Sequence, residues 1–258
     1  MKIALITGAS SGIGREAVLQ IADRFNGIDE IWAVARREER MASLKQELPA
    51  PLRILALDLM EGEALSVLAQ ELRMKKPEVK ILVNSAGYGK IGKTSTIPLA
   101  DTTGMVRLNC ESLCAVTQLV LPYMTDNSRI IQLASSAAFL PQPGFAIYAA
   151  TKAFVLSYSR ALHIELMPRR IAVTAVCPGP VRTEFFDIAE TTGELPLYKK
   201  LTMANPKKVV RLALRDSMMG KAVSVYGGWM KTFRILSKIV PHEILLRIMS
   251  TFSEAEKP

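Results

Sequence analysis

The sequence predicts an α/β fold in which about seven parallel strands form one doubly wound sheet. Short apolar runs rich in β-branched residues alternate with amphipathic segments from the first residues to about residue 226. This alternation is typical of strands that are connected by helices. The chain of 258 residues is 49% hydrophobic and has no Pro/Gly/Ser-rich linker and no internal repeat. Length and composition therefore indicate one well-buried domain.

The order of the elements follows from this alternation. The predicted strands are 3–7, 31–35, 53–57, 81–84, 129–134, 172–176 and 222–226. The predicted helices are 12–25, 37–47, 61–75, 99–124 with a possible break, 148–167 and 206–218. Pro98 and Pro206 suit positions in a first helical turn. In a doubly wound sheet the ligand crevice opens at the carboxyl ends of the strands, and the motifs described below fall at these ends.

The residues after 226 differ in charge and pattern from the rest of the chain. We expect a catalytic domain over 1–226 and a C-terminal amphipathic helical extension over 227–258. Residues 1–198 carry 21 Lys and Arg against 20 Asp and Glu, whereas residues 199–258 carry 12 against 4. Nearly all of the net charge of +9 is therefore C-terminal. Such a block can attract an anionic ligand, an acidic carrier protein or an anionic membrane, or it can be a solvated face.

The extension consists of two apolar runs interleaved with basic residues, one on each side of Pro241. Neither run has the roughly 20 apolar residues of a membrane span. A basic amphipathic helix with Trp229 and Phe233 on its apolar side can lie on a membrane surface. Packing on the body of the protein or across a dimer interface is the commoner arrangement, and we favour it here. We expect no nucleic-acid partner.

Two negative observations limit the possible sites and locations. The first residues run directly into an apolar strand without a leader pattern, so we expect a cytoplasmic protein. Cys110, Cys114 and Cys177 lack the paired spacing of a zinc site, and we expect free buried thiols. His163 and His242 are solitary, so no metal is expected.

A Gly-rich turn, TGASSGIG, covers residues 7–14 directly after the first strand. Free backbone N–H groups and the helix dipole at such a helix start can hold a pyrophosphate. Its three-residue gap after the first glycine differs from the dinucleotide fingerprint with a one-residue gap, and glycines also serve turns in proteins that bind nothing. The position after an N-terminal strand favours a dinucleotide site. The candidate phosphate contacts are Gly8, Ser10, Ser11, Gly12, Ile13 and Gly14.

The end of the second strand predicts which dinucleotide binds. An Asp or Glu there would accept the ribose 2′-hydroxyl of NAD, but this chain has Arg36 and Arg37. A guanidinium suits a 2′-phosphate by charge and geometry, and Arg15 could join them. We therefore expect NADP(H), the alternative being that the arginines merely open a solvated helix.

Tyr148 and Lys152 lie four residues apart at the start of a predicted helix, so their side chains share one face. An ammonium beside a phenol favours the phenolate, which would lower the pKa of the tyrosine toward the range of a general acid or base. Such a pair also occurs by chance in many proteins. The neighbouring motifs therefore decide its meaning.

Motifs from residue 7 to residue 183 resemble, in order and spacing, those of the short-chain dehydrogenase/reductase (SDR) family. The glycine turn looks like its phosphate loop, Asp58 like its adenine contact, and Asn84-Ser85-Ala86-Gly87 like the motif after its fourth strand. Asn109, Ser135, Tyr148 and Lys152 match its catalytic tetrad, and Pro178-Gly179-Pro180-Val181-Arg182-Thr183 resembles its nicotinamide segment. The resemblance implies a Rossmann-type fold, a homodimer or homotetramer, and further cofactor contacts at Asp58, Leu59, Asn84, Ala86, Gly87, Tyr148, Lys152, Pro178, Gly179, Val181 and Thr183.

The resemblance also implies a role for each catalytic residue. Tyr148 would pass its proton to a carbonyl oxygen while the nicotinamide C4 of NADPH delivers hydride, and Ser135 would donate a hydrogen bond to the same oxygen. Lys152 would bind the nicotinamide ribose and poise Tyr148. Asn109 would connect Lys152 to a water chain, and Thr183 would hold the carboxamide.

Two departures from the family pattern concern serines. Ser85 stands where a second Asn is commoner, and we expect this to be tolerated. Ser136 follows Ser135 directly. The spacing to Tyr148 favours Ser135, whereas a loop one residue shorter would favour Ser136.

These observations predict an NADP(H)-dependent oxidoreductase that acts on CH–OH groups. Apolar residues in 184–204, which could form a mobile lid, favour a lipophilic ketone or alcohol such as a 3-oxoacyl or hydroxysteroid-like small molecule. The alternative is a non-catalytic NADP(H) sensor, but Ser135, Tyr148 and Lys152 are all present. An epimerase or dehydratase of the longer relatives would need an extra domain that 258 residues hardly allow.

Overall fold

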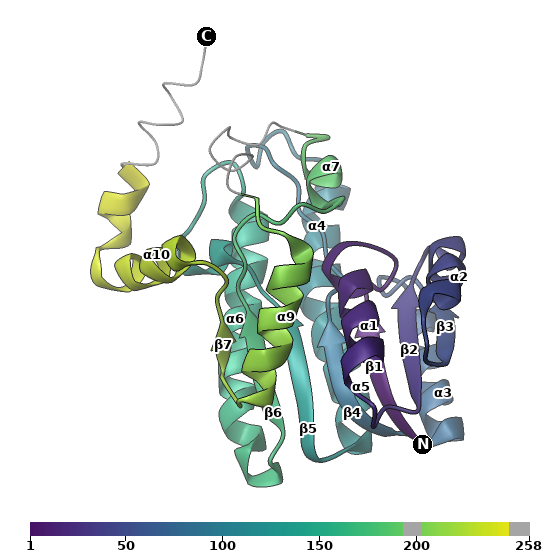
Figure 1. The fold of residues 1–258 in the computed structure, drawn as a ribbon. Coiled ribbons are helices and arrows are strands. Elements are labelled where there is room, and N and C mark those ends of the chain that lie inside the picture. Colours follow the sequence, from purple (N-terminus) through teal and green to yellow (C-terminus); the bar gives the residue numbers. More distant parts are fainter. Residues whose placement is uncertain (193–202, 248–258) are drawn as a thin grey trace.

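The computed structural model describes residues 1–192 and 203–247 and has the predicted fold class. Seven parallel strands form one sheet in the order β3-β2-β1-β4-β5-β6-β7, which is the doubly wound order with its reversal between β1 and β4 (Figure 1). The strands are β1 (Lys2–Thr7), β2 (Glu30–Ala35), β3 (Leu52–Ala56), β4 (Glu78–Asn84), β5 (Met124–Leu133), β6 (Ala172–Val176) and β7 (Val223–Ser224).

Helices cover both faces of the sheet. Ala4 and Ile6 of β1 pack in one core with α1, α2 and α9, whereas Ile3 and Leu5 pack in a second core with α3, α5 and α6. Successive strand residues point to opposite faces, so a sheet buried on both sides needs continuous apolar runs. The helices are α1 (Gly12–Arg24), α2 (Glu38–Glu47), α3 (Gly62–Lys75), α4 (Leu99–Val106), α5 (Leu113–Val120), α6 (Ala146–Leu166), α7 (Phe185–Ala189), α9 (Pro206–Met218) and α10 (Gly228–Ile239).

The long helix predicted over 99–124 has the break that the sequence suggested. Residues Arg107–Ser112 between α4 and α5 form a π-helix, η1, and Leu121–Tyr123 form a 3₁₀ turn, η2. A π turn admits one extra residue and is often found at functional sites. Asn109 lies within it and is fully buried.

Most boundaries lie within one to three residues of the predicted ones, and three differences stand out. β5 begins at Met124 instead of residue 129, because Asn127 in the left-handed region (φ 63) and a register shift against β4 let the earlier residues pair. β7 is an edge strand of two residues in place of the predicted 222–226. α6 begins at Ala146, so Tyr148 lies in its first turn.

The extension begins as predicted with an amphipathic helix, α10, which packs on the body by one side only (Figure 1). The ring of Phe233 lies 6.3 Å from that of Phe139. A Cβ atom at Gly179 would lie 2.9 Å from the sulfur of Met230. Two large apolar side chains of the same helix, Trp229 and Ile239, are 68% and 73% exposed.

A second helical segment covers 242–247, and the remainder of the predicted second run lies outside the described residues. Among the residues that the structure describes, no helix is long and apolar enough to cross a membrane. Membrane contact and self-association of the extension both stay predictions.

Candidate active site

A cavity of about 470 Å³ lies along the carboxyl ends of the strands, where doubly wound sheets bind their ligands. Its volume is within the range of small-molecule sites. Most of the predicted site residues line it: Gly8, Ser10, Ser11, Gly12, Ile13, Arg36, Arg37, Asp58, Leu59, Ala86, Gly87, Ser135, Tyr148, Lys152, Pro178, Gly179, Val181 and Thr183.

Four predicted residues, Gly14, Arg15, Asn84 and Asn109, are not among those that line the cavity. Gly14 supports the phosphate loop from behind, because a Cβ there would lie 2.2 Å from the carbonyl oxygen of Gly8. That Arg15 joins Arg36 at the cofactor stays a prediction. The Arg15 guanidinium pairs with Glu47 at the end of α2, at 2.5 Å.

Asn84 supports the floor of the site through a buried hydrogen-bond group. Its amide donates to the Thr117 hydroxyl at 2.9 Å, and the amide of Gln132 on β5 donates to the same oxygen at 3.1 Å. The Thr117 hydroxyl in turn donates to the Leu113 carbonyl. The Thr117 hydroxyl thus ties Asn84 on β4 and Gln132 on β5 to α5.

The phosphate loop between β1 and α1 has the geometry of an anion cradle. Gly8 and Gly12 have φ values of +68° and +54°, which favour glycine. The Thr7 hydroxyl accepts hydrogen bonds from the N–H groups of Ser85 and Ala86, both at 3.1 Å, and joins the loop to the end of β4. The Ser11 side chain does not cap α1, and the first turn of α1 carries no acid. These N-terminal N–H groups fit the pyrophosphate of a dinucleotide.

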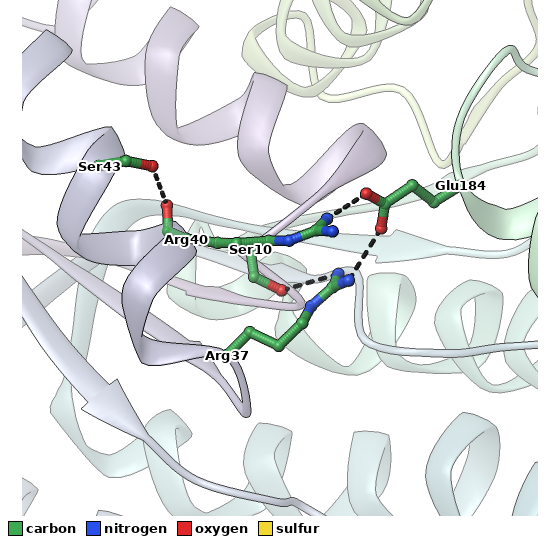
Figure 2. Close-up of polar contacts among 5 residues, drawn as sticks. All are labelled: Ser10, Arg37, Arg40, Ser43 and Glu184. Atoms are coloured by element: carbon green, nitrogen blue, oxygen red, sulfur yellow. Dashed lines mark hydrogen bonds and ion pairs between the residues drawn. The ribbon is translucent and has the colours of Figure 1, made fainter.

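Arginines from the turn after β2 and from α2 surround one end of the cavity. Arg36 lies 3.6 Å from the Asp58 carboxylate. Arg37 donates to the Ser10 hydroxyl at 3.3 Å and to Glu184 at 3.0 Å. Glu184 also pairs with Arg40 (Figure 2), and this hydrogen bond is the main cause of the lowered pKa of its carboxyl group.

Glu184 is a site residue that the sequence reasoning did not find. It follows Thr183 in the nicotinamide segment, whereas Arg37 and Arg40 lie almost 150 residues earlier in the chain. The signal that could have found it is an acid directly after a segment expected to border the cofactor.

Ser135, Tyr148 and Lys152 meet at the other end of the cavity. The Ser135 hydroxyl accepts from the Ala137 N–H at 3.1 Å and acts on the Tyr148 phenol by lowering its pKa, while Ser136 uses its backbone N–H to donate to the Pro178 carbonyl. The Lys152 ammonium donates to the Leu133 carbonyl at 2.7 Å and lies 5.6 Å from the centre of the Tyr148 ring. Of the two serines, Ser135 is therefore the one beside the tyrosine.

The electrostatics of the tyrosine differ from the sequence expectation. Burial raises the pKa of Tyr148 to about 12, and the hydrogen bond with Ser135 only partly opposes this. The ring lies between those of Phe145, at 4.3 Å, and Phe185, at 5.2 Å. Burial also lowers the pKa of Lys152 to about 8. The expectation that Lys152 lowers the pKa of Tyr148 is thus wrong here, because desolvation of both groups dominates.

Asn109 is bound entirely by protein groups. Its side chain accepts from the Tyr88 N–H at 3.0 Å and donates to the Tyr88 carbonyl at 2.9 Å and the Thr151 hydroxyl at 3.0 Å. A Cβ at Gly87 would lie 2.7 Å from the Asn109 oxygen and 3.4 Å from the Lys152 nitrogen. Glycine at this position therefore leaves the space between Asn109 and Lys152 open.

The side of the cavity proposed for the substrate is bordered by α7. α7 places Phe185 against Tyr148, and the rest of the predicted lid, 193–202, lies outside the described residues.

The three cysteines are free, but only Cys177 is buried, since Cys110 and Cys114 are half-buried. Within 1–192 and 203–247, no group of three His, Cys, Asp or Glu side chains is arranged to hold a metal ion.

The doubly wound fold and the contents of this cavity define a nucleotide-binding oxidoreductase. The sequence profile of the family described as short chain dehydrogenase matches residues 2–192, and the chain belongs to this family.

Three similar proteins illustrate the family relationship. Sulfoacetaldehyde reductase 2 of Chromohalobacter salexigens is 33% identical over 236 residues, which cover 86% of this chain and 91% of that protein. A very-long-chain 3-oxoacyl-CoA reductase of Pyrenophora tritici-repentis is 31% identical over 268 residues, or 97% of this chain and 73% of that protein. A solved short-chain dehydrogenase from Sphingobium yanoikuyae in complex with NADPH superposes with a TM-score of 0.77 at 28% identity, covering 93% of this chain and 97% of that one.

Proposed function

We propose that the protein is an NADP(H)-dependent carbonyl reductase or alcohol dehydrogenase for a lipophilic ketone or alcohol. The observation that carries this proposal is that Ser135, Tyr148 and Lys152 line the same cavity as the uncapped N-terminus of α1. A dinucleotide bound along this cavity supplies a hydride in reduction and accepts one in oxidation.

Each side chain has a role that its surroundings support. Tyr148, with its pKa raised to about 12, stays protonated near neutral pH and can give its proton to a carbonyl oxygen. The Ser135 hydroxyl beside it donates a hydrogen bond to the same oxygen, where negative charge develops. Lys152, whose ammonium lies 5.6 Å from the centre of the Tyr148 ring, binds the nicotinamide ribose. Asn109 and Thr183 position Lys152 and the carboxamide.

The preference for NADP(H) rests on the arginines at the adenosine end. Arg36 and Arg37 follow β2, where NAD enzymes of this fold carry an acid. Ser10 lies within hydrogen-bond distance of Arg37, so a phosphate there would meet both groups. The Sphingobium yanoikuyae relative is in complex with NADPH.

The lipophilic substrate is supported by the rings around Tyr148. Phe145 and Phe185 leave an apolar approach to its hydroxyl, which suits a ketone with apolar substituents. The name of the Pyrenophora tritici-repentis relative indicates a 3-oxoacyl substrate. We propose 3-oxoacyl and hydroxysteroid-like compounds as the leading classes.

The test is a screen of ketones and alcohols with NADPH and NADH, run on the wild type and on Tyr148→Phe. We expect turnover with NADPH and a loss of about 10²- to 10⁴-fold in the variant. Calorimetry should give the same NADPH affinity for both proteins, within about twofold. Tight NADPH binding by a wild type that turns over nothing would support the sensor alternative instead.

A further inference from the structure

Glu184 lines the cavity and connects the segment before α7 with the arginines that follow β2. It lies between Thr183 and α7 on the nicotinamide side, and its two carboxylate oxygens pair with Arg37 and Arg40 on the adenosine side (Figure 2). Arg37 reaches Ser10 of the phosphate loop with its other terminal nitrogen. One carboxylate thus joins three segments that are far apart in sequence: the phosphate loop, α2 and the start of α7.

The arginine that Glu184 holds is one that the proposed function assigns to the 2′-phosphate. One terminal nitrogen of Arg37 bonds to Glu184 and the other to Ser10, so a 2′-phosphate that bonds to both terminal nitrogens competes with the carboxylate for Arg37. The phosphate carries a charge of about −1.5 to −2 near neutral pH, more than the single charge of Glu184. The side chains of Arg37, Arg40 and Glu184 are 36–47% exposed, and exposed ion pairs are weak enough to be displaced.

We propose that Glu184 is a cofactor-selectivity residue that closes the cavity mouth and that a 2′-phosphate displaces. This inference rests on the proposed function, in which Arg36 and Arg37 bind that phosphate. Glu184 occupies Arg37 and Arg40 in the free protein. A ligand with a 2′-phosphate replaces it, whereas a ligand without one leaves the carboxylate in place.

Displacement of Glu184 has a consequence at the catalytic end. Glu184 precedes α7, and the first residue of α7, Phe185, packs on the ring of Tyr148. The Ile188 N–H donates to the carbonyl of Glu184. This backbone bond does not depend on the carboxylate, so release of the carboxylate frees the start of α7 only from its side-chain tie to Arg37 and Arg40. The cofactor with the 2′-phosphate would break this tie, and the one without it would not.

The test uses two probes without nicotinamide, adenosine 2′,5′-bisphosphate and adenosine 5′-monophosphate, which differ only in the 2′-phosphate. Calorimetry should show that Glu184→Gln binds the bisphosphate about three- to tenfold more tightly than wild type, as expected when one or two exposed ion pairs no longer compete. Binding of the monophosphate should not change. Unchanged or weaker bisphosphate binding in the variant would overturn the proposal.

The matched control is Asp187→Asn, which removes an exposed carboxylate from α7 itself. It should leave both affinities within about twofold of wild type, so an equal gain in this variant would reveal a general charge effect. In an Arg37→Ala, Arg40→Ala background, Glu184→Gln should lose its effect on the bisphosphate. A gain that persisted there would also contradict the competition.

A second readout follows the structure of α7 directly. Amide hydrogen exchange over 185–189 should become faster when wild type binds the bisphosphate and should not change with the monophosphate. If wild type binds both probes equally, the NADP(H) proposal fails, whatever Glu184 does. If wild type prefers the bisphosphate but Glu184→Gln gains nothing, only the role of Glu184 fails.

Discussion

Tyr148 and Lys152 at one end of the cavity are 8% and 5% exposed, whereas the side chains of Arg36 and Arg37 at the other end are 62% and 39% exposed. Burial raises the pKa of Tyr148 to about 12 and lowers the pKa of Lys152 to about 8. The arginines meet their partners in water, where charges are screened. The groups proposed for catalysis are thus strongly desolvated, whereas the arginines proposed to select the cofactor lie where ions exchange partners easily.

The largest loss of activity is expected when Ser135, and not its neighbour Ser136, is substituted. Ser135→Ala should lower kcat by about a hundredfold or more, since a hydrogen-bond donor to the developing oxyanion is lost. Ser136→Ala is the matched control and should stay within a few-fold of wild type, because its backbone N–H, not its hydroxyl, bonds to Pro178. Steady-state kinetics on both variants test this. A larger loss in Ser136→Ala would move the substrate contact to the second serine.

The buried lysine predicts a pH dependence of stability. The pKa of Lys152 is about 8 in the folded protein against 10.5 unfolded, so between these values the unfolded chain binds more protons and stability rises with pH. Relative to Lys152→Met, wild type should gain about 2 kcal/mol in the free energy of unfolding between about pH 7 and about pH 9.5.

Urea unfolding of both proteins at the two pH values measures this gain. Lys45→Met replaces an exposed lysine and should show no such difference from wild type. A constant gap between wild type and Lys152→Met would mean that the buried ammonium is not desolvated as its surroundings indicate.

At the exposed end, Arg36→Ala and Arg37→Ala should each raise the KM for NADPH by about tenfold or more, the value of one charge-assisted hydrogen bond. The KM for NADH should change little. Initial rates with both cofactors test the prediction. Equal changes in the two KM values would show that these arginines do not bind the 2′-phosphate.

The smallest expected effect is that of salt. An increase from about 0.05 M to about 0.5 M NaCl should weaken NADPH binding several-fold, because exposed charges are screened. The kcat at saturating cofactor and substrate should stay nearly constant, since the groups beside Tyr148 are buried. If kcat fell as steeply as the affinity, the groups beside Tyr148 would be as open to salt screening as the exposed arginines.

Local patterns predicted most of the fold and the site. Strand and helix order, Ser135 beside Tyr148, and the glycine loop all follow from short segments whose spacing fixes their geometry. Contacts between distant segments were not predictable in this way. Arg15 pairs with Glu47 and Arg37 with Glu184, and nothing in the spacing of either segment identifies its partner. The raised pKa of Tyr148 was not predicted, because the burial that causes it depends on Phe145 and Phe185 together. Only the folded chain brings these two rings to the tyrosine.

The contacts of α10 have a mechanical consequence. Met230 touches Gly179 of the nicotinamide segment, and Phe233 touches Phe139 in the 3₁₀ turn after Ser135. The inner side of α10 therefore packs on both of these backbone segments. A change in how α10 packs would thus act on the wall of the cavity that carries Ser135.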